Sequence, residues 1–203
     1  MDEAFKMFLG NFSIGTVGRC EVPASSIRRY EGRLPSKLIN YWEEHGWAGY
    51  GDGVFWTVDP ERYEGVVSSW LEETPLDAKD KFHVIARSAF GLLYLWGENT
   101  GPSLKIAAYA SRYIERESLF VPNQLDKAVE SFFMLKGVRD NDFCDMFTSA
   151  KKKLGVLESD EMYGFFPALT LGGRGEIEDI QKVKAVEHLV FLSQISDLQS
   201  YGF

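Results

Sequence analysis

Histidine and cysteine side chains are the groups in this chain that could ligate a metal or act as base and nucleophile. The histidines, His45, His83 and His188, each lack a second ligand at the spacing of an HExxH or CxxC motif. Cys20 and Cys144 have no histidine near them in sequence, which leaves pairing in space open. We therefore predict no metal site, no cofactor and no catalytic residue. We expect His45 to cap a helix, the other two histidines to be structural, and Cys144 to be buried.

Two glycine-rich stretches, Gly49–Gly53 (GYGDG) and Gly172–Gly175 (GGRG), are of the composition that can cradle a phosphate. Neither matches the dinucleotide fingerprint GxGxxG or the phosphate-binding motif GxxxxGK[ST], and no GxSxG nucleophile motif is present. A tight turn between two elements is therefore the better interpretation of both stretches.

Carboxylates recur in clusters on the predicted helices. The clusters are Glu43-Glu44, Asp59/Glu61/Glu64, Glu72-Glu73, Asp140/Asp142/Asp145 and Asp160-Glu161. One interpretation is that they form the solvated faces of amphipathic helices. The other is that they form a negative surface that attracts a cationic partner and sets its orientation. Paired carboxylates could also do acid–base chemistry, but no partner base accompanies them.

The overall charge favours the binding of a protein over the binding of nucleic acid. The 203 residues include 30 acidic and 22 basic side chains, for a formal net charge of -8. A nucleic-acid binder needs clustered Lys and Arg. The N-terminal residues lack a basic segment followed by an apolar one, and the apolar run Phe90–Trp96 is too short for a membrane helix. We therefore expect a cytoplasmic protein.

The first part of the chain predicts an α+β unit. Helices are expected at residues 1–12, from Leu34 to Gly46, and from an Asp59 cap with Pro60 in the first turn. Short apolar runs predict strands, which glycines separate into an antiparallel sheet. The predicted strands are 54–58, 82–86, 92–96, 104–109 and 118–121. We place the end of this unit at residue 121.

Residues 122–203 predict a mainly helical second part. Helices are expected at 123–137 and at 140–154, the latter capped by Asp140 and ended by Gly155. Residues 163–171 predict an extended segment around Pro167, and residues 177–198 a strand followed by a helix or a mostly helical segment. The predicted class is thus α+β, with N-terminal helices and an antiparallel sheet followed by a mainly helical C-terminal part.

Two stretches resemble known families. The run from Arg33 to Trp70, together with Ile85–Trp96 (IARSAFGLLYLW), resembles the GAD-like domain. The stretch Glu161–Gly173 (EMYGFFPALTLGG), with Gln181–Leu189 (QKVKAVEHL), resembles the C-terminal domain of type VI secretion immunity proteins of the Tdi type. The resemblance implies two domains, 1–121 and 122–203, in a bacterial immunity protein that binds and inhibits a toxic effector, most often a DNase. It implies no catalytic residue.

The residues themselves agree with such a role. An acidic inhibitor can compete for the cationic cleft of a nuclease and associate with it quickly. Aromatic side chains beside acids would supply the anchors of the interface, although the core explains Phe55 and Trp56 equally well. The candidate toxin-binding residues are Glu43, Glu44, Trp47, Tyr50, Asp52, Asp59, Glu61 and Glu64.

Two other functions remain open from the sequence. The GAD name is shared with an insert domain of tRNA-dependent amidotransferases, so the chain could be an accessory module of an RNA-handling assembly. The absence of a basic stripe speaks against direct tRNA contact. An enzyme that neutralises the toxin chemically is the third possibility, and no residue spacing supports it.

Overall fold

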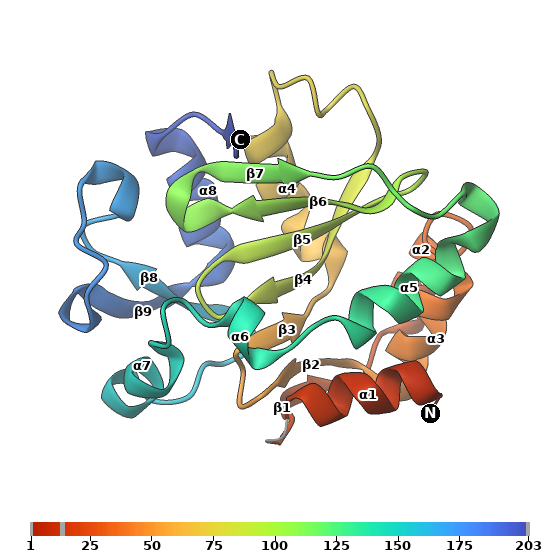
Figure 1. Cartoon of the computed structure of the whole chain (residues 1–203), viewed down its shortest axis with the longest axis horizontal. Helices are drawn as coiled ribbons and strands as arrows, with labels where there is room; N and C mark the ends of the chain where they lie inside the picture. The colour runs from red at the N-terminus through yellow and green to blue at the C-terminus, as the bar shows by residue number, and fades with distance from the viewer. Residues whose placement is uncertain (1, 13–14, 202–203) are drawn as a thin grey trace.

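The computed structural model describes residues 2–12 and 15–201, and its centre is an eight-stranded sheet (Figure 1). The strands follow one another across the sheet in the order β1-β2-β3-β4-β5-β6-β7-β10, and neighbours are antiparallel except that β10 runs parallel to β7. Their bounds are β1 Val17–Cys20, β2 Trp47–Tyr50, β3 Phe55–Thr57, β4 Phe82–Ser88, β5 Leu92–Gly97, β6 Gly101–Ala107, β7 Arg112–Glu115 and β10 Gln199–Ser200.

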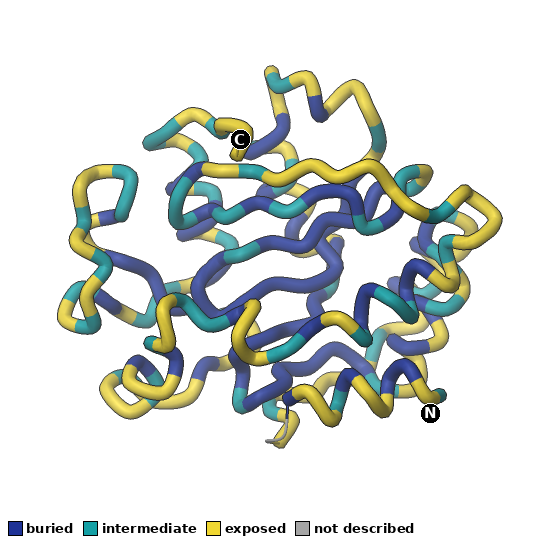
Figure 2. The backbone as a smooth tube through the Cα atoms, in the orientation of Figure 1, coloured by how far each residue is buried: buried dark blue, intermediate teal, exposed yellow. Residues whose placement is uncertain are grey.

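Helices cover both faces of this sheet. On one face α5 (Leu125–Met134) packs against α1 (Glu3–Asn11), α3 (Ser36–His45) and β6. On the other face α4 (Glu64–Leu71) packs against α8 (Ala185–Ile195) and β4, behind the sheet in the view of Figure 1. Every residue of β4 is consequently buried, as the dark centre of Figure 2 shows. A strand covered on both faces has an apolar run in place of an alternating pattern.

A separate two-stranded sheet extends the fold at one end of the large sheet (Figure 1). The hairpin of β8 (Glu161–Phe165) and β9 (Ile180–Lys184) leads directly into α8. The other helices are α2 Ala24–Tyr30, α6 Val138–Asn141 and α7 Phe147–Leu154, and the short 3-10 helices are η1 Pro60–Tyr63, η2 Ala108–Ala110, η3 Pro122–Gln124, η4 Leu169–Leu171 and η5 Ile177–Asp179. Within the described ranges, no helix is long and apolar enough to cross a membrane.

The α+β class predicted from the sequence is confirmed, and so are several helix ends. Asp59 accepts a hydrogen bond from the Glu61 amide at 3.1 Å, and Pro60 follows as the first residue of η1. Gly46 ends α3 with a φ of 73°, a conformation that costs a side-chain-bearing residue energy.

The helix predicted over 140–154 is wrong. The chain instead forms α6 and α7, because Cys144 and Asp145 between them adopt left-handed backbone angles with φ of 50° and 59°. Asp140 consequently lies inside α6 and caps no helix. The strand predicted at 118–121 is wrong as well, since the last antiparallel strand of the large sheet is β7 at 112–115. Neither β1 nor α2 was predicted.

The glycine-rich stretch after α3 is a tight turn joining two strands, as predicted, but the strand β2 before the turn was missed. Gly49 in β2 lies against the indole of Trp56, where a Cβ would come within 2.7 Å of the ring. The Trp56 Nε1–H donates to the Gly53 carbonyl at 2.7 Å. The glycines therefore make room for an indole ring.

Candidate functional site

A groove of about 580 Å³ lies where β2, β3 and η1 meet the first turn of α8. Its walls carry four carboxylates and one guanidinium, and we call it the acidic groove. The lining residues are Cys20, Glu21, Pro23, Trp47, Ala48, Trp56, Thr57, Val58, Asp59, Arg62, Tyr63, Ser159, Asp160, Val186 and Glu187. Segments that lie more than a hundred residues apart in the sequence thus form one concave surface.

The groove has an apolar floor and an acidic rim. The floor contains the indoles of Trp47 and Trp56, which are 6% and 1% exposed. The rim carries Glu21 and Glu187, both exposed to solvent. A concave apolar surface surrounded by charge is the usual anatomy of a protein-binding patch. The chemistry that this arrangement offers is attraction and seating of a cationic group.

The other two carboxylates of the groove differ in their electrostatic surroundings. Burial raises the pKa of Asp59, and the hydrogen bond from the Glu61 amide partly opposes that rise. The Asp160 carboxylate accepts a hydrogen bond from the Lys184 ammonium at 2.7 Å, which lowers its pKa. Asp160 therefore has a local counter-ion.

The structure brings only two of the predicted toxin-binding residues, Trp47 and Asp59, into this groove. Trp47 and Tyr50 were expected to be exposed aromatic anchors, and this expectation is wrong, because both lie in β2 within the covered sheet. Tyr50 is 3% exposed and packs against the rings of Phe5 and Phe8.

The remaining predicted residues lie outside the groove. Asp52 in the turn after β2 forms an ion pair with Lys151 of α7 at 2.6 Å. The carboxylates of Glu61 and Glu64 both pair with Arg29 of α2, at 3.2 and 2.8 Å.

Glu43 and Glu44 are exposed on α3. The acidic residues predicted to bind the toxin are thus distributed over several surfaces, and among them only Asp59 is in the groove.

Sequence reasoning missed the other charged residues of the groove. Glu21 follows a strand that was not predicted, and Arg62 and Glu187 lie in segments for which helices were predicted but to which no binding role was given. Asp160 was noted only as a member of an acidic cluster. No short-range pattern connects residues 21, 59, 160 and 187, because their proximity is created by the tertiary fold.

A buried arginine supports the wall of the groove. Arg87 of β4 is 0% exposed, and its guanidinium stacks at 5.4 Å from the Trp56 ring. It donates to the Tyr63 hydroxyl at 2.8 Å and to the main-chain carbonyls of Ser159 and Glu161 at 3.0 and 2.7 Å. A buried cation needs its donors satisfied, and here neutral oxygens satisfy them. Arg87 therefore ties β4 to the segment that enters β8.

Further contacts join the same two parts of the chain. The Tyr163 amide donates to the Ala89 carbonyl at 2.8 Å. The Trp70 indole N–H donates to the Leu189 carbonyl at 3.1 Å. Gly164 leaves room for the His188 ring, since a Cβ there would lie 2.7 Å from its Nε2. These contacts form a seam in which β4 and α4 pack on β8 and α8.

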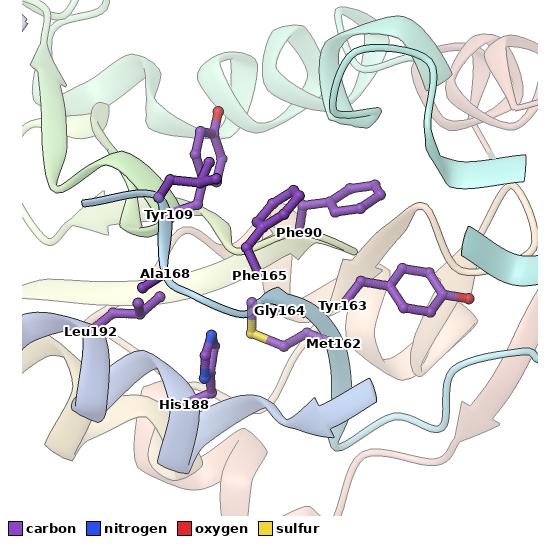
Figure 3. Close-up of a pocket in the computed structure, with 10 residues that line it drawn as sticks. Phe90, Tyr109, Met162, Tyr163, Gly164, Phe165, Ala168, His188 and Leu192 are labelled. Atoms are coloured by element: carbon purple, nitrogen blue, oxygen red, sulfur yellow. The ribbon is translucent and has the colours of Figure 1, made fainter. Parts of the chain in front are cut away.

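A small cavity lies within this seam (Figure 3). Its volume is about 10 Å³, which is the space of one water molecule. Phe90, Phe165 and His188 lie around it, and burial lowers the pKa of the His188 imidazole. The cavity is too small for a substrate, so we assign it to packing.

The other candidates for chemistry are also dispersed. His83 is buried and its Nε2 lies 2.8 Å from a carboxylate oxygen of Glu98, as expected of a structural histidine. His45 ends α3 and stacks on Phe5 with 3.7 Å between the ring centroids. Cys144 is an exposed free thiol, so the expectation that it is buried is wrong. Across residues 2–12 and 15–201, no cluster of three or more potential metal ligands occurs.

Comparison with known proteins assigns the two parts of the chain. The family model of the GAD-like domain matches residues 3–110, and that of the type VI secretion immunity protein Tdi1, C-terminal domain, matches residues 126–196. The crystal structure of Atu4351 from Agrobacterium tumefaciens is similar in fold, with a TM-score of 0.81 and 21% identity over 92% of this chain and 88% of that one. No curated protein gave a significant match.

The acidic groove lies across both matched segments, because residues 20–63 belong to the first and residues 159–187 to the second. The immunity domain supports a role in type VI secretion immunity. The GAD-like match alone spans more than half of the chain. The chain therefore belongs to the GAD-like family, with the Tdi1-type immunity domain following the GAD-like domain.

Proposed function

We propose that this protein binds and inhibits a cognate type VI secretion effector, a DNase toxin, in the bacterial cytoplasm. The observation that carries the proposal is the acidic groove, whose walls come from both family-matched segments. The protein acts by direct, stoichiometric contact, and it performs no chemistry on the toxin or its product.

The charge of the groove complements a nuclease. A DNase neutralises the phosphates of its substrate with Lys and Arg side chains, so its substrate-binding surface is cationic. Carboxylates on the rim of the groove attract that surface at long range and raise the association rate. Pro23 and Val186, the more exposed apolar side chains of the groove, then pack against the alkyl part of a Lys or Arg side chain.

The acidic residues contribute unequally to this interface. Glu21, Asp59 and Glu187 line the groove, and within the described chain none of them has a cationic partner at ion-pair distance. Asp52, Glu61 and Glu64 already pair with cations of this chain, which neutralise part of the negative charge that each could offer to a partner. Glu43 and Glu44 on α3 form a second, separate candidate surface.

Charge reversal in the groove tests the proposal. We expect Glu21→Lys combined with Glu187→Lys to slow association with a catalytically inactive form of the effector encoded beside this gene. The association rate should fall about tenfold or more at low salt and differ less at high salt, because salt screens charge steering. Glu72→Lys combined with Glu73→Lys, just after α4, is the matched control, since it changes the net charge by the same amount at two exposed positions outside the groove.

Other outcomes separate the alternatives. Reversal of Glu43 and Glu44 that slows association while the groove variant does not would move the interface to α3. Absence of any complex by calorimetry, with the effector still active in the mixture, would refute inhibition by binding. Protection of DNA by substoichiometric amounts of this protein would instead indicate an enzyme.

A further inference from the structure

A second pocket, of about 210 Å³, lies between β6, the segment after β7 and the C-terminal half of α5. It shares no lining residue with the acidic groove. Its lining is Tyr94, Leu95, Pro102, Leu104, Lys105, Arg116, Glu117, Ser118, Leu119, Phe120, Ala128, Ser131, Phe132, Leu135 and Lys136. Three of these side chains are cations, although the chain as a whole is acidic. We call it the cationic pocket.

Lys136 is the central cation of this pocket. It is only 8% exposed, and its Nζ lies 4.3 Å from the centroid of the Phe132 ring and 5.0 Å from that of Tyr94. Within the described part of the chain, no hydrogen bond or ion pair engages its ammonium group. An ammonium group that is largely removed from water and has no counter-ion is costly, and proteins normally pair such a group. The aromatic rings supply only part of that compensation.

Two further cations converge on the same space. The Lys105 ammonium lies 5.4 Å from the Tyr94 centroid, over a ring that Lys136 also approaches. Burial, together with repulsion from Lys105 and Arg116, lowers the pKa of Lys136 to about 8. Burial and the nearby Arg116 also lower the pKa of Lys105. The pocket thus concentrates positive charge that an anion would neutralise.

The opposing charges around the pocket are fewer. The negative charge of Asp140 in α6 partly opposes the lowering of the Lys136 pKa. Glu117 is the one carboxylate among the lining residues. Neither is within ion-pair distance of Lys136 in the described structure. The net charge of the lining is therefore positive at neutral pH.

We propose that the cationic pocket binds a small organic oxyanion, in which a phosphate or carboxylate is attached to a planar apolar group. The oxyanion lies between Lys105, Arg116 and Lys136, where charge-assisted hydrogen bonds replace the missing counter-ion. The apolar group packs against Tyr94 and Phe132, which form the aromatic wall.

The size and rim of the pocket fit such a ligand. A volume of about 210 Å³ is below the range for drug-sized molecules, so the ligand is of fragment size. Leu119 and Leu135 at the rim are 94% and 70% exposed, and they are placed to cover an apolar group bound beneath them. Nothing in this proposal depends on toxin binding.

Calorimetric titration of the full-length protein tests the site. The probes are phenyl phosphate, inorganic phosphate and phenol, at constant ionic strength in amine buffers. We expect phenyl phosphate to bind with a Kd of about 1 mM or lower, inorganic phosphate more weakly, and phenol without measurable heat. Lys136→Met should weaken phenyl phosphate binding about tenfold or more, whereas Lys127→Met, at an exposed lysine of α5 outside the pocket, should leave it unchanged.

Proton uptake provides a second readout. An oxyanion stabilises the charged form of Lys136, so binding at pH 8 should take up about half a proton, measured from buffers of different ionisation enthalpy. Lys105→Met, a half-buried position, serves if Lys136→Met fails to fold, and it should also weaken binding.

Absence of phenyl phosphate binding to the wild type would overturn the proposal, as would equal weakening by Lys127→Met. Equal affinity for inorganic and phenyl phosphate would overturn the role of the aromatic wall. Tighter binding of acetyl-aspartate, titrated as a fourth probe without a planar group, would likewise overturn the role of the aromatic wall.

Discussion

Replacement of Lys136 by methionine is expected to make the ligand-free protein more stable at neutral pH. Lys136 is 8% exposed and its pKa is lowered from 10.5 to about 8. Folding therefore disfavours the protonated side chain, by about 3 kcal/mol at pH 7 (about 2.5 pKa units at about 1.4 kcal/mol each). Methionine has a similar length and no charge, so it removes this penalty and keeps most of the packing.

The pH dependence is the more specific signature. Between pH 8 and 10.5 the unfolded state binds the Lys136 proton more than the folded state, so wild-type stability rises with pH in that window. The advantage of Lys136→Met should shrink by about 1 kcal/mol from pH 7 to pH 9, and by about 2 kcal/mol at pH 9.5.

Urea unfolding of both proteins at several pH values measures this advantage. Packing differences between lysine and methionine shift its absolute value but create no slope, whereas the cation–π contacts with Phe132 and Tyr94 act only on the protonated side chain and so act through the folded-state pKa. A stability difference between the two proteins that is constant from pH 7 to 9.5 would refute the reasoning.

Three further predictions concern the seam and the N-terminus. Arg87→Met should lower the free energy of unfolding, measured in urea, by about 3 kcal/mol. Arg87→Lys should recover little of this stability, because a lysine lacks the forked donors of an arginine. A decrease in the free energy of unfolding below about 1 kcal/mol for Arg87→Met would contradict this prediction. Gly164→Ala should cost about 1–3 kcal/mol by thermal unfolding, since the new methyl group displaces His188, and an unchanged Tm would contradict it. Burial alone would raise the pKa of Asp2, but hydrogen bonds, led by the one from Lys37, lower it to about 2. This carboxylate therefore stabilises the fold above pH 3.8, and that stability is lost as the pH falls towards 2. Asp2→Asn should therefore cost about 2 kcal/mol at pH 7 and about half as much at pH 3, and a loss that is equal at both pH values would refute this.

Local chemistry made part of the fold predictable. The beginning of a helix at Asp59-Pro60 and the end of a helix at Gly46 both depend on capping, which neighbouring residues determine. The apolar runs of β4 and β5 also predicted strands, because a sheet covered on both faces leaves long apolar segments.

Tertiary effects account for what was missed. Nothing in the sequence near Cys144 and Asp145 signals left-handed backbone angles, so the pattern of one helix continued across them. Trp47 and Tyr50 lie beside acidic residues in the sequence, so they were interpreted as part of a surface patch. The glycines in and after β2 interrupt the apolar pattern of a strand, and the strand was therefore not predicted.

The candidate site was only partly predictable for the same reason. Of the predicted residues, Trp47 and Asp59 line the groove, while its other walls come from segments folded next to them. The division of the chain at residue 122 stays a prediction, and α5 beyond it packs against α1 and α3 in the core.

The way in which Arg87 holds its partner segment has a consequence for variation among relatives. Its guanidinium donates hydrogen bonds to the main-chain oxygens of Ser159 and Glu161, and these bonds do not involve the side chains of the two residues. Any residue at 159 or 160 can therefore occupy the wall of the groove while the anchor stays in place. The fold thus separates the main-chain anchor from the side chains of the wall, so the charge and shape of the groove can change while the framework stays the same.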